Sequence, residues 1–348
     1  MAIRMKDIAN DLGLSAVTVS KVLSGHPDIG EETRGRVLAR VKELDYQPNV
    51  LARSLVTGRS YLVGLIVPDL LHPFFAEVAQ ALSNAIRAKG YSLIVSSSEE
   101  DPDLERREIR QLLARRLDAL VIASAGSSVE QFELMDSRKD PYVLIDRDFR
   151  GISANFVGVD DEAAGRIATE HLLDMGCKRI AHIRGRQNST GIGRFEGYRK
   201  ALASRGLPCP EKYVISRFNV DTQSLEQGAD AMKRLLGLSP RPDGVFCYND
   251  PLAMGAINTI IEEGLKVPED LAVIGCGNLH YDSCLRVALS SIDQHSAEIG
   301  KRAADVVLNL IESKQTSRAR RCILEPALVV RASSQRNRIP SQPSSSGK

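Results

Sequence analysis

The sequence lacks the marks of membrane and secreted proteins. No apolar run approaches the roughly 20 residues that a membrane-spanning helix needs. The first residues, MAIRMKDIANDLG, have no apolar core of the kind found in a secretory signal. We therefore expect a cytoplasmic protein without a membrane partner.

The cysteine spacing and the net charge also indicate no particular site or partner. The six cysteines occur without any CxxC spacing, so the sequence predicts neither a zinc site nor a disulfide framework. We expect no metal and no cofactor. The formal net charge is only +2, so any argument for nucleic acid as a partner has to come from pattern.

The motifs of the common α/β enzymes are also missing. Gly191 and Gly193 are followed by Gly197 one residue too late for GxGxxG, and neither GxxxxGK[ST] nor GxSxG occurs. The six histidines are far apart in the sequence and indicate no local metal cluster. We therefore expect that the protein is not an enzyme.

What the chain does contain falls into three stretches. An Ala- and Val-rich helical head is followed by a long alternation of apolar and helical segments, and then by a polar tail. Turn and linker signals predict a headpiece over residues 1–47, a hinge and linker over residues 48–60, and a disordered tail over residues 334–348.

The long middle stretch has the alternation that is typical of an α/β fold. Helical segments separate most of its short β-rich runs, which predicts parallel sheets with crossover helices in a doubly wound architecture. The runs are too many for one sheet and start afresh near residue 158, which indicates two lobes with a ligand between them. The β-rich runs cover residues 62–68, 91–97, 117–124, 142–147, 179–185, 243–250 and 271–277. The expected lobes are residues 61–159 plus 291–320, and residues 160–290 plus 321–333.

The head has the spacing of a helix-turn-helix. Lys6–Leu12 has apolar residues at helical intervals, and Gly13 supplies the left-handed conformation that ends a helix. Ser15 stands where a side-chain oxygen can cap a second helix over Ala16–Ser24. A third helix, from about Glu31 to Leu44, completes an all-α three-helix unit.

The outer face of the second helix predicts a DNA-reading surface. Its side chains are mostly short, which lets a helix approach the major groove closely. Periodicity alone leaves the alternative of an ordinary amphipathic helix pair open. The face consists of Ala16, Val17, Thr18, Ser20 and Lys21, and we place Ser15 at the same surface.

The string KDIANDLGLSAVTVSKVLSGHPDIGEETRGRVLARVKELDYQPNVLARSL resembles the headpiece and hinge of the LacI family of bacterial transcriptional regulators across its whole length. The resemblance implies that Ala16, Val17 and Lys21 read bases. The two apolar side chains suit thymine methyls, whereas Lys21 reaches either a guanine edge or only a phosphate. Thr18 and Ser20 are then phosphate contacts.

The resemblance also implies a hinge helix. Asn49 resembles its start, and Ala52 and Arg53 belong to the string ARSL, whose Leu55 matches a leucine that wedges into a central base step. So short a helix is unstable alone and is expected to form only on DNA. The alternative for Leu55 is an ordinary core residue.

Residues 61–333 resemble the periplasmic-binding-protein-like sensor core of the same family. In DLLHPFFAEV the resemblance places His72 and Phe74 near bound ligand, although a helix cap with a core phenylalanine is the alternative. Asp146 and Arg147 end a strand at the expected cleft, where a carboxylate and a guanidinium can bind sugar hydroxyls. A surface ion pair is the alternative for them.

Five further residues are assigned to the ligand, with Asn278 among them as a candidate substitute for a carboxylate that the family carries. Arg194 in NSTGIGR matches the ligand-gripping arginine of the family, with a salt bridge at a helix start as the alternative. Phe218 aligns with a stacking aromatic residue. Asn249 is expected to point into the cleft while Asp250 caps a helix. The remaining two are Gln294, at a crossover between lobes, and Asn278.

One position departs from the family pattern. Many members carry an aspartate in the loop after LAVIG, where this chain has Gly277. Asn278 or His280 could take the place of that carboxylate, or the ligand could be something other than a plain sugar.

Together these features predict a repressor of a catabolic operon. A homodimer would bind a pseudo-palindromic operator in double-stranded DNA, with half-sites about 34 Å apart. A small molecule, expected to be a carbohydrate, would bind between the lobes and change operator affinity, by induction or by corepression.

Overall fold

The computed structural model describes residues 3–23, 26–46, 54, 57–126, 129–149, 151–217, 221–313 and 319–336. The chain divides into two compact units, Met1–Tyr61 and Leu62–Lys348. Among the described residues, no helix is long and apolar enough to span a bilayer.

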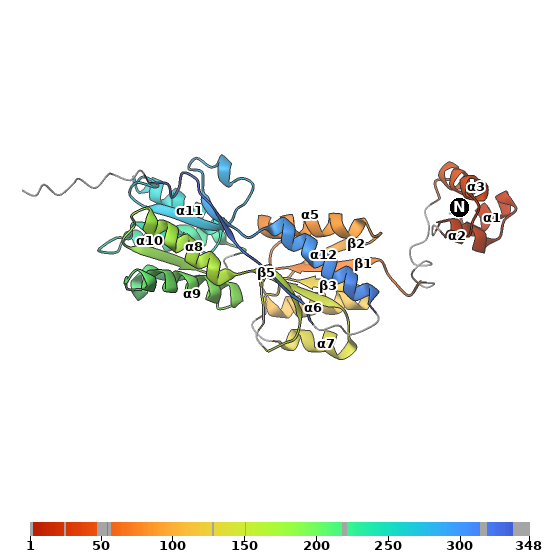
Figure 1. Cartoon of the computed structure of the whole chain (residues 1–348), viewed down its shortest axis with the longest axis horizontal. Coiled ribbons are helices and arrows are strands. Elements are labelled where there is room, and N and C mark those ends of the chain that lie inside the picture. Colours follow the sequence, from red (N-terminus) through yellow and green to blue (C-terminus); the bar gives the residue numbers. More distant parts are fainter. Residues whose placement is uncertain are drawn as a thin grey trace, which may run out of the picture. The chain divides into compact units, whose positions relative to one another are not determined.

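The first unit is a three-helix bundle formed by α1 (Met5–Leu12), α2 (Ala16–Leu23) and α3 (Glu31–Glu43) (Figure 1). Gly13 ends α1 in the left-handed conformation, with φ of 66°. The Ser15 side chain accepts a hydrogen bond from the Thr18 N–H at 3.0 Å, and it therefore caps α2. The buried core of this unit consists of Ile8, Ala9, Val19, Val22 and Val37.

The second unit contains two six-stranded sheets, one in each lobe (Figure 1). The first sheet has the strand order β11-β5-β4-β3-β1-β2, and all its neighbouring strands are parallel. Its strands are β1 (Leu62–Val67), β2 (Ser92–Ser97), β3 (Ala119–Ile122), β4 (Tyr142–Ile145), β5 (Asn155–Val159) and β11 (Arg321–Leu324). Four helices belong to this lobe: α5 (Pro73–Arg87), α6 (Pro102–Ala114), α7 (Glu130–Arg138) and α12 (Ser296–Glu312).

The second sheet has the order β12-β10-β9-β8-β6-β7 and is parallel except for β12, which runs antiparallel to β10. Its strands are β6 (Ile180–Arg184), β7 (Val214–Ser216), β8 (Gly244–Cys247), β9 (Ala272–Gly277), β10 (Ser290–Asp293) and β12 (Ala327–Val329). Its helices are α8 (Asp161–Asp174), α9 (Ser189–Ser204), α10 (Ser224–Leu236) and α11 (Asp250–Glu262), with short 3₁₀ turns at Glu211–Tyr213 and Asp282–Cys284.

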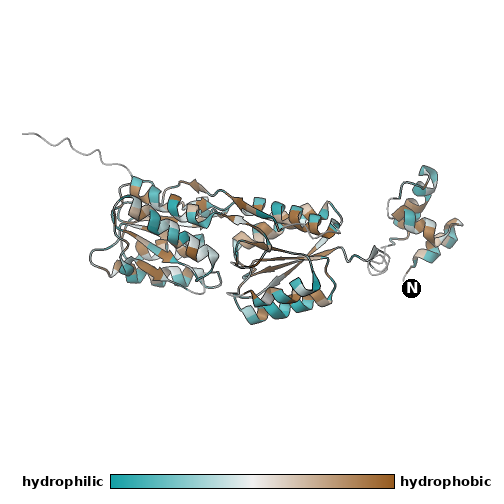
Figure 2. Cartoon of the chain, turned by 60° about the horizontal axis from the view of Figure 1, so that its bottom comes forward, coloured by the Kyte–Doolittle hydropathy of each residue, from teal (hydrophilic) through white to brown (hydrophobic). Residues whose placement is uncertain are grey.

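Each lobe is built around apolar strands. The strands are coloured as mainly hydrophobic in Figure 2, whereas the helices carry hydrophilic residues as well. Strand β1 is buried from Val63 to Val67, as expected for a strand covered on both faces. The predicted all-α headpiece and two-lobed, doubly wound core are thus confirmed.

The lobe crossovers differ slightly from the expected boundaries. Strand β10 pairs with β9 and β12, so it belongs to the second lobe, although the prediction began the return to the first lobe at residue 291. Strand β11 pairs with β5 in the first lobe, although the prediction assigned residues from 321 to the second. A strand's hydrogen bonds keep it in one sheet, so the chain changes lobe in the loops that follow β10 and β11.

Candidate functional site

The second helix of the headpiece presents one apolar side chain prominently to solvent. Val17 is 66% exposed, while Val19 and Val22 on the opposite face are buried in the three-helix core. Ala16 is half-buried against that core, and Thr18 and Ser20 are also half-buried. The predicted reading face therefore exists as a surface, and its contact with DNA stays a prediction.

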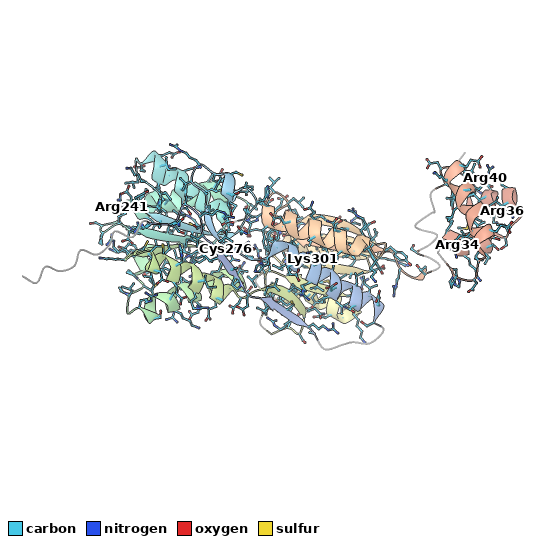
Figure 3. The ribbon with its side chains drawn as sticks, turned by 45° about the horizontal axis from the view of Figure 1, so that its top comes forward. Arg34, Arg36, Arg40, Arg241, Cys276 and Lys301 are labelled. Carbon is cyan, nitrogen blue, oxygen red and sulfur yellow. The ribbon has the colours of Figure 1, made fainter. Side chains whose placement is uncertain are left out.

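Arginines of α3 hold the other helices of the headpiece in place (Figure 3). Arg36 Nη2 donates to the Leu12 carbonyl at 3.1 Å, at the end of α1. Arg40 pairs with Asp11 of α1, and Arg34 donates to the His26 carbonyl at 2.7 Å. Arg36 and Arg40 therefore link α3 to α1, and Arg34 links α3 to the segment after α2. The sequence analysis did not assign these roles.

Several predicted contacts cannot be placed. Asn49, Ala52, Arg53, Leu55 and Phe218 all lie outside the described residues. The hinge helix and the stacking aromatic residue therefore stay predictions from resemblance.

In the core unit, Arg194 of α9 is buried in the second lobe and is 2% exposed. Its Nε donates to Asp161 at 2.9 Å, its Nη1 to the Tyr248 carbonyl at 2.6 Å, and its Nη2 to Gln294 Oε1 at 2.6 Å. The salt bridge considered as the alternative for Arg194 is thus present, and Gln294 joins the same group.

Glycines explain how α9 brings Arg194 to this position. A Cβ on Gly165 of α8 would lie 2.0 Å from the Arg194 carbonyl, and one on Gly197 would lie 2.0 Å from the Glu162 carbonyl. Gly193 and Gly197 of GIGRFEG therefore allow α9 to approach α8 closely, whereas a Cβ on Gly191 would meet the Arg186 carbonyl, which precedes α9. Close backbone packing accounts for this glycine-rich string, which fits no phosphate-binding motif.

Arg147 is the centre of a second group and joins the two lobes. It follows β4 in the first lobe and is 2% exposed. Its Nη1 donates to the Ser124 carbonyl at 2.9 Å, and its Nη2 to Glu100 Oε1 at 3.2 Å. The same Nη2 donates to Asp221, which precedes α10 in the second lobe. A surface ion pair, the alternative for Arg147, is therefore excluded.

His72 and Asn249 extend this group across the cleft. His72 Nε2 lies 3.3 Å from Asn249 Nδ2 and 3.8 Å from Asp221 Oδ1. Asn249 Oδ1 accepts the Leu252 N–H at 3.0 Å, so Asn249 caps α11 while its Nδ2 faces the cleft. The expectation that Asp250 is the cap was wrong, because the Asp250 carboxylate is turned toward β10 and accepts from Ser291 Oγ at 2.6 Å.

Burial alters the acidity of these groups. It raises the pKa of Glu100 to about 8, an effect that the neighbouring Asp221 carboxylate reinforces and that Arg147 opposes. It also raises the pKa of Asp146 to about 7, against Arg194 and Arg147. Burial alone would raise the pKa of Asp221, but Arg147 and His72 hold it below its usual value. Burial lowers the pKa of His72 despite Asp221, which favours the neutral ring.

Two predicted ligand residues lie apart from these groups. Phe74 is 3% exposed and packs edge-on against Phe75, as in the alternative interpretation of that string. Asn278 is turned toward the C-terminal segment, where its Oδ1 accepts from Arg331 Nη2 at 2.7 Å. Asn278 therefore does not supply the missing cleft carboxylate.

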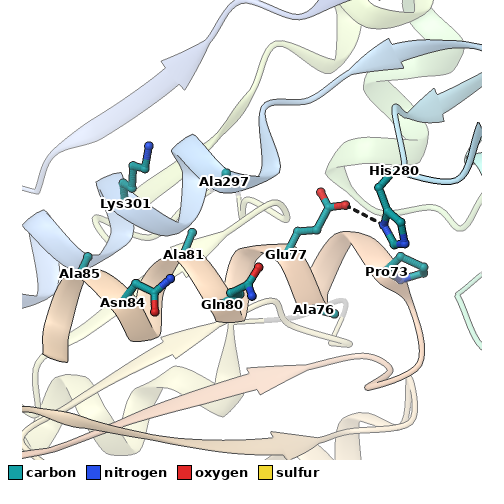
Figure 4. A pocket seen from close by; sticks show the side chains of 10 residues that line it. All are labelled: Pro73, Ala76, Glu77, Gln80, Ala81, Asn84, Ala85, His280, Ala297 and Lys301. Carbon is teal, nitrogen blue, oxygen red and sulfur yellow. Dashed lines mark hydrogen bonds and ion pairs between the residues drawn. The ribbon is translucent and has the colours of Figure 1, made fainter. Parts of the chain in front are cut away.

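His280 does not supply it either. Its ring is 73% exposed and contacts Glu77 Oε1 at 3.3 Å through Nδ1 (Figure 4). The two residues line a groove of about 980 Å³ on the outer faces of α5 and α12, together with Pro73, Ala76, Gln80, Ala81, Asn84, Ala85, Ala297 and Lys301. This groove is a different surface from the cleft that Arg147 and Arg194 occupy.

The structure brings together six of the nine residues predicted to bind ligand: His72, Asp146, Arg147, Arg194, Asn249 and Gln294. Sequence analysis missed Glu100, Asp161 and Asp221, which pair with the two arginines. No spacing in the sequence marked them, since Arg147 and Asp221 are 74 residues apart.

Comparison with known proteins gives two family matches. Residues 4–49 match the model described as bacterial regulatory proteins, lacI family, and residues 60–330 match periplasmic binding proteins and sugar binding domain of LacI family. The HTH-type transcriptional repressor PurR of Haemophilus influenzae (strain PittEE) is 31% identical over 335 residues, covering 94% of this chain and 98% of the relative.

The similarity to solved structures agrees with these family matches. A complex of the transcriptional regulator CelR with cellobiose superposes with a TM-score of 0.72 at 27% identity, covering 95% of this chain and 99% of the other. The lac repressor dimer bound to operator and the anti-inducer ONPF gives a TM-score of 0.84 over 96% and 99% of the two chains. Its sequence identity is 24%, so that likeness concerns the fold alone.

Proposed function

Since this chain belongs to the LacI family of bacterial regulatory proteins, we propose that it represses a catabolic operon under the control of a sugar or sugar derivative. The chain is a DNA-binding, ligand-regulated transcriptional regulator and not an enzyme. The observation that carries the proposal is the polar group around Arg147 and Arg194, which lies between two lobes of a core attached to a helix-turn-helix unit.

The headpiece is assigned to the operator. Ala16 and Val17 contact thymine methyls, Lys21 contacts either a guanine edge or a phosphate, and Ser15, Thr18 and Ser20 contact the backbone. Two headpieces of a homodimer in the cytoplasm then read a pseudo-palindromic site, and paired hinge helices with Asn49, Ala52, Arg53 and Leu55 enter the minor groove.

The cleft is assigned to the effector. The family model's description as a sugar binding domain supports a carbohydrate, as does the chemistry of the site. Buried carboxyl, amide and guanidinium groups can each bind hydroxyls. We assign His72, Asp146, Arg147, Arg194, Asn249 and Gln294 to ligand contacts, and Phe218 by resemblance. A ligand that favours one lobe arrangement changes operator affinity, and DNA must change ligand affinity by the same factor.

Selection from a random duplex pool tests the regulator assignment. We expect the full-length protein to enrich pseudo-palindromes, with affinity that falls steeply with salt yet persists against competitor DNA. A protein that enriches no palindrome over random duplex, with and without candidate sugars, sugar acids and nucleosides, would contradict it. Leu55→Ala should reduce operator bending in a circular-permutation gel assay, while enrichment of the same half-sites continues.

A further inference from the structure

Buried carboxyl groups outnumber buried guanidinium groups in the cleft. Among the described residues, Arg147 and Arg194 face a set of four acids there: Glu100, Asp146, Asp161 and Asp221. A third guanidinium group, that of the partly exposed Arg186, also pairs with Glu100 at 3.6 Å. The side chains of all four acids are at most 11% exposed. Charge of this kind inside a protein has to be paired or neutralised by protons.

Both guanidinium groups are already neutralised by the protein. Arg147 is held by Asp221 and Glu100, and Arg194 by Asp161. An anionic ligand would have to take one of these arginines from its carboxylate, which would leave that carboxylate buried without a partner. Such an exchange is strongly unfavourable in a protein interior.

Among the described residues, three polar atoms of the Arg147 group are buried and have no hydrogen-bond partner, although Arg147 Nε lies within ion-pair distance of Asp146 Oδ2, at 3.8 Å. They are Nδ1 of His72, Oε2 of Glu100 and Nε of Arg147. The three side chains are between 2% and 6% exposed and come from loops after β1, β2 and β4. A buried polar atom without a partner is costly, so these atoms indicate that a ligand supplies the missing hydrogen bonds.

A cavity beside Arg147, which is the member of this group that lines it, is also acidic. It measures about 590 Å³, and both lobes line it. Its charged lining residues are Arg147, Asp148, Glu162 and Glu196, and no lysine is among them. The partners of these three acids, Arg321, Lys200 and Arg199, are not part of the lining.

We propose that Glu100 and Asp221 make this cleft selective for a polyhydroxyl ligand that carries no acidic group. A hydroxyl accepts from Arg147 Nε and donates to Glu100 Oε2, whereas a carboxylate or phosphate only accepts and adds negative charge. The inference rests on the proposed role of the core as a ligand sensor. The raised pKa of Glu100, caused by burial and by Asp221, is consistent with a site that already holds too many acids.

Two pools of compounds test the proposal on the full-length protein without DNA. One contains neutral monosaccharides and sugar alcohols, and the other contains the matching sugar acids and sugar phosphates at the same concentrations. Mass spectrometry identifies the compounds that the protein retains in equilibrium dialysis, and calorimetry measures their affinity. We expect retention from the neutral pool only. Retention of a sugar acid or phosphate, or of nothing from either pool, would overturn the proposal.

Substitutions then test the two acids. Glu100→Gln and Asp221→Asn should each weaken binding of the retained sugar by about 10- to 100-fold, because each removes a carboxyl group that accepts a hydrogen bond from Arg147 in the cleft. Glu108→Gln is the matched control, since Glu108 lies on α6 outside the cleft and accepts from Ser96 Oγ. Unchanged affinity in both cleft variants, with folding verified by circular dichroism, would also overturn the proposal. The selection of pseudo-palindromic duplexes by the ligand-free protein tests the regulator assignment separately.

Discussion

The carboxylate of Asp250 occupies the space that a side chain on Gly277 would need. A Cβ built on Gly277 would lie 2.7 Å from Asp250 Oδ2, and Gly277 itself has φ of 145°. Asp250 is fully buried and is held there by Ser291 Oγ at 2.6 Å and by the Leu279 N–H at 3.3 Å. The absence of an aspartate at position 277 therefore has a local structural reason, which is independent of the ligand.

We expect Gly277→Ala to destabilise the core unit by about 2 kcal/mol or more, because it combines a disfavoured backbone conformation with a steric clash. Urea denaturation of the full-length protein measures the loss. Gly264→Ala is the matched control, since Gly264 has φ of 76° but open space around its Cβ position. It should cost about 1 kcal/mol. Equal losses for the two variants would show that Asp250 does not restrict position 277.

A second prediction concerns Arg194 and Asp161. Removing Arg194 leaves Asp161 nearly buried without its guanidinium partner, and breaking such a pair costs about 3–5 kcal/mol. Arg194→Ala should therefore lower the thermal midpoint markedly. Asp161→Asn added to Arg194→Ala should recover part of the loss, since it removes the unpaired charge. Additive losses in this double-mutant cycle would contradict a direct ionic interaction.

The sequence predicted elements better than it predicted contacts between them. Apolar runs located β1, β3 and β9 because a buried parallel strand is recognisable from its own residues. The lobe crossovers were misplaced because pairing partners, and not the strand sequences themselves, decide to which sheet β10 and β11 belong.

The same reasoning applies to the cleft. Arg147 and Asn249 could be predicted because they follow strands whose carboxyl ends face the cleft. Asp221 could not, because it follows no strand directly and reaches Arg147 only through the packing of the two lobes. Glu100 lies in the loop after β2, but it was missed because its role depends on Asp221.

The raised pKa of Glu100 predicts a pH-dependent stability. Its folded pKa of about 8 exceeds its ordinary value of 4.5, so the folded state binds more protons than the unfolded state between these values. The groups that face it are Asp221, Arg147 and Arg186. The stabilising contribution of Glu100 to the free energy of unfolding is therefore fully present below pH 4.5. It is lost as the pH rises through 8, by at most about 1.4 kcal/mol per pH unit.

Glu100→Gln should remove this dependence, because an amide does not titrate. The measurement is the difference between the unfolding free energies of the parent and the variant from pH 4.5 to 8, which cancels contributions from other acids. We expect the difference to shift in favour of the variant as the pH rises. A difference that stays constant with pH would mean that Glu100 is ionised throughout this range, and Glu108→Gln provides the flat reference curve.

The last prediction decides between the two roles open to Lys21. Its Nζ lies 3.7 Å from Asp28 Oδ2, and both side chains are largely exposed, so this pair contributes little and leaves the ammonium group available. Ala16 and Val17 offer no hydrogen-bond donor in their side chains, which leaves Lys21 as the donor among the three base-reading positions. We therefore expect Lys21→Ala to relax specificity at one base pair of each half-site by about 1–3 kcal/mol.

Binding of the Lys21→Ala variant to a set of single-base operator variants measures this effect. Lys42→Ala removes the same charge from α3 of the same unit and serves as the control. A phosphate contact would instead weaken all sequences alike and reduce the slope of log affinity against log salt by about 0.9. That outcome would assign sequence reading in this helix to the apolar pair alone, and the operator should then discriminate thymine from the other bases but not guanine.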